Sequence, residues 1–356
     1  MTGVLTEAEA MVRALRLAAT PGVPLGPNPR VGCVLLADDG SVVAEGHHRG
    51  AGTPHAEADA LSRAGEAARG TTAVVTLEPC NHTGRTGPCA PALISAGVRR
   101  VVFAHHDPNP VAGGGAQALA AAGVEVEHGL LAAEAERLNR AWLFGLARQR
   151  PLLTWKFATT LDGRSAAADG TSRWVSSRAA RLDTHRRRAE CDVMLVGTET
   201  VAVDDPVLTV RDATDQPLPH QPLRAVMGIR DLDPGRRIFD DQAETVQLRT
   251  RDPQAALAGL FERGRRHVFL EGGPTLAAAF LRAGLVDEIV CYVAPMLLGA
   301  GRSAVGDLGI DTITAALCPE VTDITVLDGL DGLDGLDGLE APDGEPPNVR
   351  ITLRPR

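Results

Sequence analysis

Four residues in the first third of the chain have the types and spacing of a metal-dependent hydrolytic site. His55 and Glu57 stand two positions apart in the segment HAEADAL, and Cys80 and Cys89 lie within the Pro-, Gly- and His-rich segment PCNHTGRTGPC. Zinc favours thiolate and imidazole ligands, and a catalytic zinc uses three protein ligands plus water. His55, Cys80 and Cys89 supply three ligands, which predicts one Zn²⁺ per chain with Glu57 beside its water.

The chemistry that this arrangement favours is hydrolytic deamination. A zinc ion lowers the pKa of its water toward neutrality, and a carboxylate carries the water proton to the ring nitrogen and then to the leaving ammonia. HAE and Pro79–Cys80 fit the H-x-E and P-C pattern of zinc nucleobase deaminases. The second cysteine departs from that pattern, because eight residues lie between Cys80 and Cys89 where the pattern has two.

Two other classes of zinc protein compete with this interpretation. A deaminase of tRNA or single strands needs a basic groove with aromatic side chains, whereas this chain has a formal charge of −9 and 3% aromatic residues. A structural zinc module usually closes its metal with four protein ligands, and only His82 is placed to serve as the fourth. We therefore expect no nucleic-acid partner, and the charge still permits a small anionic substrate.

The elements that must position these residues alternate in type, as an α/β fold requires. The first half predicts an amphipathic N-terminal helix with Met11, Leu15 and Ala18 on one face, and strands at 31–37, 41–48, 72–79, 98–105 and 124–129. It predicts further helices at 56–68, 90–97, 114–123 and 133–150. The second half predicts strands at 152–158, 191–197, 224–229, 267–273, 288–295 and 348–355, and helices at 253–264 and 274–285.

A length of 356 residues exceeds one ordinary core and predicts two domains. Pro151 ends the helix expected before it, so we place the join near Arg150, with domains at 1–148 and 151–356. The period-three repeat at 327–338 belongs to a segment, 327–346, that we expect to be a flexible acidic hairpin insert. A metal-binding role for its Asp residues is the less favoured alternative.

Other features narrow the protein class. The chain has no run of eighteen apolar residues, so we expect no membrane span. Its N-terminus carries acids and no apolar signal core, which favours a cytoplasmic location. Six cysteines in a long cytosolic chain do not predict a disulfide framework.

Longer segments carry a resemblance to a known family. They are PNPRVGCV, GHHRGAGTPHAEADAL, TLEPCNHTGRTGPCAPALISAGVRRVV, DPNP, KFATTLDGRSA, SRWVSS, VGTETVAVDDPVLTVR, EGGPTLAAAFLRAGLVDE and APMLLG. In order and over nearly the full chain, they resemble the bifunctional deaminase/reductases of bacterial riboflavin biosynthesis. The resemblance implies a cytidine-deaminase-like first domain and a second domain similar to dihydrofolate reductase.

The same resemblance implies two reactions. The first is deamination of 2,5-diamino-6-(5-phosphoribosylamino)pyrimidin-4(3H)-one. The second is NADPH-dependent reduction of the ribosyl group, which gives 5-amino-6-(5-phosphoribitylamino)uracil. We also expect a homo-oligomer.

In the first domain the resemblance carries over the zinc ligands His55, Cys80 and Cys89 and the proton donor Glu57. It places substrate contacts at Asn28, His48, His82 and Arg85. Arg85 offers a charged fork that suits a phosphate, although a solvated loop charge is its alternative interpretation. For His48 and His82 the alternative is a structural or exposed ring.

In the second domain the resemblance places Lys156 and Asp204 in the reductase site, and which of them supplies the proton stays open. Lys156 lies in an expected strand, where a snorkelling side chain is the alternative, and Asp204 lies in an expected loop, where a turn cap is the alternative. Substrate contacts are implied at Ser172, Arg188, Leu208, Arg211 and Glu271. Cofactor contacts are implied at Ala158, Trp174, Thr200, Asp204, Gly273, Pro274, Thr275, Leu276, Ala277, Ala278 and Ala279.

The glycine turn before residue 274 fits a cofactor on physical grounds. Glycines let a backbone approach a ligand closely, and a helix start offers free N–H groups to a phosphate. The chain departs from the family after the strand LRAVM, where Gly228 and Ile229 stand in place of the usual Asp–Ser pair that meets the cofactor.

Overall fold

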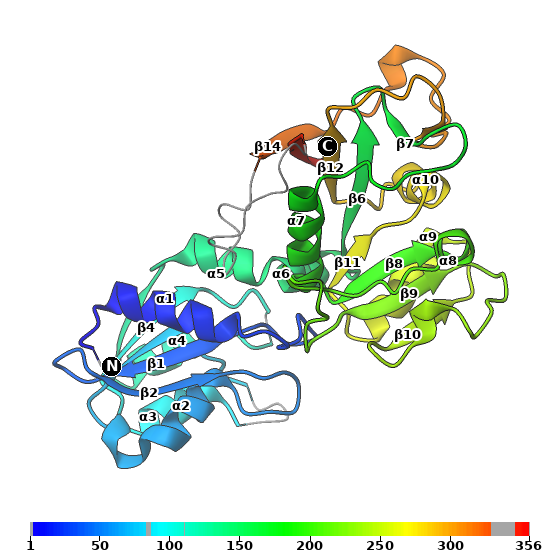
Figure 1. The fold of residues 1–356 in the computed structure, drawn as a ribbon. Helices are drawn as coiled ribbons and strands as arrows, with labels where there is room; N and C mark the ends of the chain where they lie inside the picture. Colours follow the sequence, from blue (N-terminus) through cyan, green and yellow to red (C-terminus); the bar gives the residue numbers. More distant parts are fainter. Residues whose placement is uncertain (1–2, 83–86, 110, 329–345, 356) are drawn as a thin grey trace. The chain divides into compact units, whose positions relative to one another are not determined.

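The computed structural model describes residues 3–82, 87–109, 111–328 and 346–355, and the chain forms two compact units, Met1–Gln149 and Arg150–Arg356. Each unit contains a main sheet with helices packed against it (Figure 1). Among the described residues, no helix has the length and apolar character needed to cross a membrane. The α/β alternation predicted from the sequence is therefore present in both halves.

The first unit is built on a five-stranded sheet of order β2-β1-β3-β4-β5. β1 pairs antiparallel with β2 and β3, whereas β3, β4 and β5 run parallel. All five strands confirm predicted segments, and their bounds are β1 Gly32–Leu36, β2 Val42–His47, β3 Thr72–Leu77, β4 Arg100–His105 and β5 Glu125–His128.

Helices cover both faces of this sheet. α2, α3 and α4 pack on one face in a core that includes Ala60, Leu93 and Phe103, and α1 and α5 pack on the other through Met11 and Ala135. Successive side chains of a strand point to opposite faces, so the central strands β1, β3 and β4 contribute apolar side chains to both cores. The helices are α1 Glu7–Ala18, α2 Ala56–Ala64, α3 Cys89–Ser95, α4 Gly115–Ala121, α5 Ala132–Leu138 and α6 Arg140–Arg148, with a 3₁₀ turn at Gly65–Ala68.

The single helix predicted over 133–150 is wrong, because the structure breaks it at Asn139 into α5 and α6. The Asn139 side chain accepts a hydrogen bond from the backbone N–H of Arg30 (2.8 Å) and donates one to the Arg30 carbonyl (2.9 Å). Asn139 is buried. A buried amide that pairs with both backbone groups of a distant residue competes with the helical ladder, which explains the break.

The second unit is built on an eight-stranded sheet of order β10-β9-β8-β11-β6-β12-β15-β14. The first six strands in that order are parallel, and β15 pairs antiparallel with both β12 and β14. The strands are β6 Leu152–Thr160, β8 Val193–Gly197, β9 Leu223–Met227, β10 Thr245–Leu248, β11 His267–Leu270, β12 Glu288–Ala294, β14 Glu320–Leu327 and β15 Asn348–Arg354. A separate pair is formed by β7 Arg164–Ala166 and β13 Arg302–Ser303.

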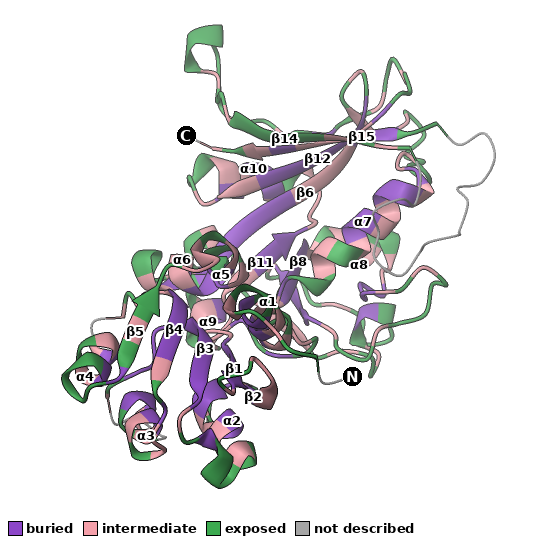
Figure 2. Cartoon of the chain, turned by 90° about the vertical axis from the view of Figure 1, so that its left-hand side faces the viewer, coloured by how far each residue is buried: buried purple, intermediate pink, exposed green. Residues whose placement is uncertain are grey.

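Four helices flank the second sheet. α9 and α10 pack on one face through Leu257 and Phe280, and α7 and α8 pack on the other through Ala180 and Val201. Figure 2 shows the central strands as buried and the edge strands β5 and β14 as largely exposed. The bounds are α7 Arg178–Ala189, α8 Thr198–Asp204, α9 Pro253–Glu262 and α10 Pro274–Arg282, with short 3₁₀ turns at Arg237–Phe239 and Ile313–Ala315.

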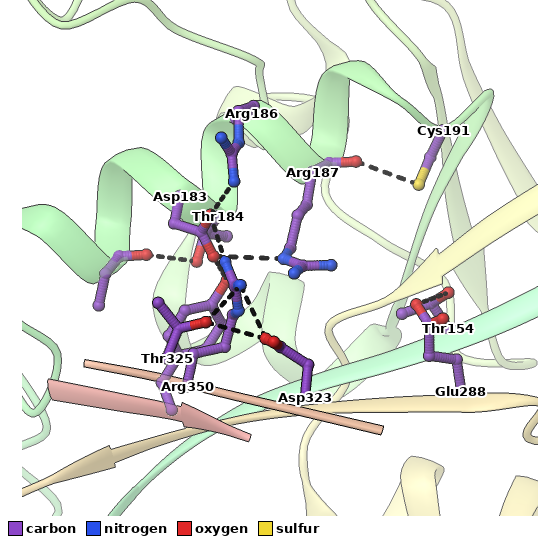
Figure 3. Close-up of polar contacts among 12 residues, drawn as sticks. Thr154, Asp183, Thr184, Arg186, Arg187, Cys191, Glu288, Asp323, Thr325 and Arg350 are labelled. Carbon is purple, nitrogen blue, oxygen red and sulfur yellow. Dashed lines mark hydrogen bonds and ion pairs between the residues drawn. The ribbon is translucent and has the colours of Figure 1, made fainter. Parts of the chain in front are cut away.

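Helix α7 carries a buried carboxylate, Asp183, that is neutralised from several elements (Figure 3). The Tyr292 hydroxyl donates to it at 2.6 Å, and Arg350 of β15 lies at 3.0 Å. Arg350 also bonds Asp323 of β14 at 3.0 Å. Burial raises the pKa of Asp183, but the Tyr292 hydrogen bond and the neighbouring arginines outweigh burial and lower it. This network anchors α7 to three strands.

The LDG repeat was predicted to be a hairpin insert. β14 and β15 pair antiparallel with Leu327 opposite Asn348, and the repeat from residue 329 onward lies outside the described residues.

Candidate metal centre and candidate reductase site

Three predicted zinc ligands converge from different elements of the first unit. His55 is the N-cap of α2, Cys80 follows β3, and Cys89 is the first residue of α3. His55 Nδ1 lies 3.5 Å from Cys80 Sγ and 3.4 Å from Cys89 Sγ, and all three donor atoms fall within 4.8 Å of one another. Tetrahedral zinc bonds of about 2.0–2.3 Å place nitrogen and sulfur ligands roughly 3.5 Å apart. The spacing therefore fits zinc.

The thiol chemistry of the site also fits a divalent cation. Without metal, the hydrogen bond from the Cys89 thiol, helped by His55, lowers the pKa of Cys80 to about 4. The same hydrogen bond, together with burial, raises the pKa of the Cys89 thiol. The two sulfurs thus share one negative charge, and a bound cation supplies the charge that holds both as thiolates.

Glu57 lies in the first turn of α2 and is buried, with 3% of its surface exposed. Burial raises the pKa of its carboxyl group to about 7. It is not part of the three-residue ligand group. A carboxyl group with a pKa near neutrality both accepts and returns a proton, which suits a general acid–base.

A cavity of about 360 Å³ opens on these residues, and the predicted substrate contacts Asn28, His48 and His82 line it. His48 Nδ1 lies 3.0 Å from the Pro54 carbonyl and His48 Nε2 lies 3.1 Å from Asn28 Nδ2. Because a carbonyl only accepts, Nδ1 carries the proton and Nε2 accepts from Asn28. Burial lowers the pKa of His48, which keeps the ring neutral. Arg85 lies outside the described residues.

The residues that line the cavity and were not predicted from the sequence include Glu78, Asp107, Asn109 and Trp142. Asp107 and Asn109 belong to the DPNP segment and Glu78 to TLEPC, so the motifs that carry the family resemblance contained a signal for them. Trp142 comes from α6, far along the chain, and has no local signal.

In the second unit, three predicted residues contact one another. Arg188 of α7 donates two hydrogen bonds to Glu271, at 2.5 and 2.9 Å, and Lys156 Nζ of β6 lies 3.8 Å from Glu271 Oε2. Burial lowers the pKa of Lys156 more than Glu271 raises it. Burial alone would raise the pKa of Glu271, but Arg188 and Lys156 together lower it to about 2. One carboxylate shared by two cations leaves a net positive charge.

Thr200 follows the carboxyl end of β8 and Gly273 follows that of β11, and ligands bind at such ends in open α/β sheets. Asp204 was expected in a loop, but it is the last residue of α8 and is exposed. No hydrogen bond or ion pair joins it to Lys156 in the described part of the chain. Leu208 is buried with a φ of 55°, and Arg211 pairs with Asp215 at 2.9 Å.

The predicted cofactor contacts also differ in exposure. Trp174 is exposed, and the Arg181 guanidinium lies 4.5 Å from its ring centre; the neighbouring Ser172 is exposed as well. Ala158 lies on β6 and Thr200 on α8. Gly273 is the N-cap of α10, which contains the predicted residues 274–279. The side chains of Ala277 and Ala278 are buried.

Glycine at position 228, where the family usually has Asp, suits the backbone conformation found there. Gly228 has a φ of 143°, and a Cβ placed there would lie 2.8 Å from the Thr198 side chain. A larger residue would strain this turn and displace Thr198. The acidic residue usual in the family does not fit this backbone.

Comparison with known proteins covers both units. The family model described as the cytidine and deoxycytidylate deaminase zinc-binding region matches residues 5–105, and the RibD C-terminal domain matches residues 151–327. These matches confirm the predicted fold class for each unit.

Individual relatives match most of the chain. The riboflavin biosynthesis protein RibD of Mycobacterium tuberculosis (strain ATCC 25618 / H37Rv) is 53% identical over 292 residues, covering 82% of this chain and 86% of that protein. RibD of Escherichia coli (strain K12) is 43% identical over 323 residues, covering 82% and 88%.

Two solved structures extend over nearly the whole chain. Acinetobacter baumannii RibD (form 2) aligns with a TM-score of 0.81 and 35% identity, covering 98% of this chain and 99% of that one. A diaminohydroxyphosphoribosylaminopyrimidine deaminase/5-amino-6-(5-phosphoribosylamino)uracil reductase of Thermotoga maritima aligns with a TM-score of 0.80 and 28% identity, covering 98% and 99%.

Proposed function

The chain belongs to the RibD family of bifunctional riboflavin-biosynthesis deaminase/reductases, and we propose that the metal centre and the Lys156–Arg188–Glu271 cluster are its two reaction sites. The deaminase unit acts on 2,5-diamino-6-(5-phosphoribosylamino)pyrimidin-4(3H)-one. The reductase unit then converts the ribosyl group of the product to ribityl, which gives 5-amino-6-(5-phosphoribitylamino)uracil. The convergence of His55, Cys80 and Cys89 beside buried Glu57 is the observation that carries the first assignment.

In the deamination site, His55, Cys80 and Cys89 would hold zinc, which would make water a nucleophile at neutral pH by lowering its pKa. Glu57 would carry the first proton of the attacking water to the ring nitrogen and then the proton of the added hydroxyl to the amino group, which leaves as ammonia. Its pKa of about 7 suits both transfers. His48 and Asn28, held together at 3.1 Å, orient the pyrimidine in the cavity, with His82 on its wall. Arg85 is proposed to hold the phosphate.

In the reductase site, a nicotinamide cofactor supplies the hydride, and we take it to be NADPH. The N-terminus of α10, with Gly273 as its N-cap, offers backbone N–H groups to the cofactor's phosphates. Lys156 holds a proton at Nζ near the reacting carbon, and Arg188 and Glu271 fix its surroundings. The excess positive charge of the cluster suits a phosphorylated substrate.

The remaining assignments of this unit rest on the family pattern. Asp204 orients substrate hydroxyls, the other substrate contacts are Ser172, Leu208 and Arg211, and the other cofactor contacts are Ala158, Trp174, Thr200 and residues 274–279. We further propose a cytoplasmic homo-oligomer.

The test of the metal assignment measures zinc and ammonia together. A Cys80→Ser, Cys89→Ser double variant should lose zinc and release no ammonia from the diamino substrate, because serine does not replace thiolate ligands. A chelator should have the same effect on the unaltered protein. Cys318→Ser is the matched control, since Cys318 is exposed and belongs to the second unit; it should keep both properties. Full zinc content in the double variant would contradict the assignment.

A further inference from the structure

A buried carboxylate beside the metal centre has no role in the mechanism above. Glu78 follows β3 and precedes the ligand Cys80 by two positions, and its side chain is only 5% exposed. It lines the cavity together with the predicted ligands His55 and Cys80. An isolated buried carboxylate is costly, so its partners show what holds it there.

Three donors from one chain segment converge on Glu78. The backbone N–H of Ala116 donates to Oε1 at 3.0 Å. His106 Nδ1 donates to Oε2 at 3.0 Å, and the backbone N–H of Asp107 approaches the same oxygen at 3.4 Å. The carboxylate thus joins the end of β4 to the start of α4. Hydrogen bonds to an ionised acceptor are the stronger kind.

The segment held in this way forms part of the cavity wall. Asp107, Asn109 and Ala112 all line the cavity, and they stand between His106 and Ala116, the two ends that Glu78 holds. The wall meets the metal-binding strand closely, since a Cβ at Gly115 would lie 1.7 Å from the Pro79 carbonyl oxygen. A backbone bond from Asn81 N to the Ala112 carbonyl, at 3.1 Å, is a further link.

We propose that Glu78 is a positioning residue of the deamination site: it fixes the wall that carries Asp107, Asn109 and Ala112 at the distance from Cys80 that the substrate ring requires. This inference rests on the proposed deaminase function. The wall supplies no metal ligand, and Glu57 lies on α2, outside it. A displaced wall therefore weakens substrate binding more than it slows the chemical step.

The first test is Glu78→Gln, which keeps size and burial but replaces one acceptor oxygen with an NH₂ group. At least one of the three donors then loses its acceptor. We expect KM for the diamino substrate to rise about tenfold, with kcat within about twofold of the unaltered enzyme and zinc content unchanged. Glu66→Gln is the matched control, because Glu66 is exposed in the 3₁₀ turn after α2; its KM should not change.

A second variant approaches the same contact from the wall. The His106 side chain is 56% exposed, so His106→Ala removes one donor at little structural cost. This substitution should raise KM by a few fold. In the double variant, the combined rise in KM should be smaller than the product of the two single effects, because Glu78→Gln and His106→Ala remove the same interaction.

Three results would overturn the inference. The first is an unchanged KM in Glu78→Gln with unchanged kcat. The second is a fall in kcat and zinc content with unchanged KM, which would indicate that Glu78 supports only the segment that carries Cys80. Multiplicative effects in the double variant would show that the two residues act separately. Failure of the proposed function would look different, because the unaltered zinc-loaded enzyme would then release no ammonia.

Discussion

The two candidate sites differ in how many of their predicted residues lie together in the protein without a bound ligand. In the first unit the metal-binding atoms lie within 4.8 Å of one another, and the predicted substrate side chains in the described residues line the same cavity. In the described part of the second unit, the ion pairs among predicted catalytic and substrate residues are those of Lys156 and Arg188 with Glu271. A metal needs donor atoms at fixed bond lengths, whereas a site for a cofactor and a substrate is distributed over the ends of several strands.

The largest expected effect separates the two sites by single substitutions. Glu57→Gln leaves the three ligands in place, so zinc should remain, but it removes the proton-carrying group. Ammonia release should fall by roughly 10²- to 10⁴-fold. NADPH oxidation on already deaminated substrate should be retained, because the reductase residues lie beyond Arg150. The measurement follows ammonia and NADPH separately.

Lys156→Ala is the reciprocal change. It should impair NADPH oxidation and leave ammonia release close to that of the unaltered enzyme. If a folded Glu57→Gln protein also failed to oxidise NADPH on deaminated substrate, the two sites would not be independent. The assignment of one reaction to each unit would then be wrong.

A smaller effect concerns the stability that the charged cluster gives the second unit. The pKa of Glu271 is lowered from the ordinary 4.5 to about 2, which corresponds to roughly 3 kcal/mol. Because the folded pKa is depressed, this stabilisation is present above about pH 4.5 and is lost as the pH falls toward 2. Glu271→Gln should therefore destabilise the second unit at pH 7, and the difference from the unaltered protein should shrink in acid.

Urea unfolding at pH 7, 5 and 3, followed by amide hydrogen exchange in peptides of β11, measures this difference. Glu262→Gln, an exposed change at the end of α9, should have no effect at any pH. A Glu271→Gln deficit that stayed constant from pH 7 to pH 3 would argue against the charge-based explanation.

The smallest expected effect is that of shortening the LDG repeat. Its composition contains no residues able to form a core beyond single leucines, and loop length changes closure entropy only slowly. Deleting residues 330–338 should leave both activities unchanged and move the melting temperature by less than about 2 °C. A loss of either activity would mean that the repeat contributes to a site.

The secondary structure was predictable where the apolar periodicity of the sequence was strong. It was less predictable where polar contacts between distant residues determine which side chains are buried. The buried strands β1, β3 and β4 of the first sheet followed from apolar runs, whereas α7 was missed because its buried face contains Asp183 and Thr184. The distant Arg350 and Tyr292, together with Arg186 and Arg187 of the same helix, pair with the Asp183 carboxylate. β14 was missed because most of its residues are exposed at a sheet edge, so its side chains show no buried alternation.

The sites follow the same division. His55, Cys80 and Cys89 were recognisable because their residue types are unusual and lie in short motifs. Glu78 and Trp142 were missed because a carboxylate and an indole are commonly structural, and only the folded chain brings them to the cavity. Asp204 was placed in a loop because its position at the end of α8 depends on packing around Val201.

The break at Asn139 has a consequence for the smallest part of the chain that can work alone. Its side chain holds both backbone groups of Arg30, two residues after the cavity-lining Asn28. The predicted zinc ligands end at the start of α3, yet a fragment that stopped there would lose the Asn139 amide that holds the Arg30 backbone and the Trp142 side chain that lines the cavity. We therefore expect independent deamination by the first unit to require the polypeptide through α6.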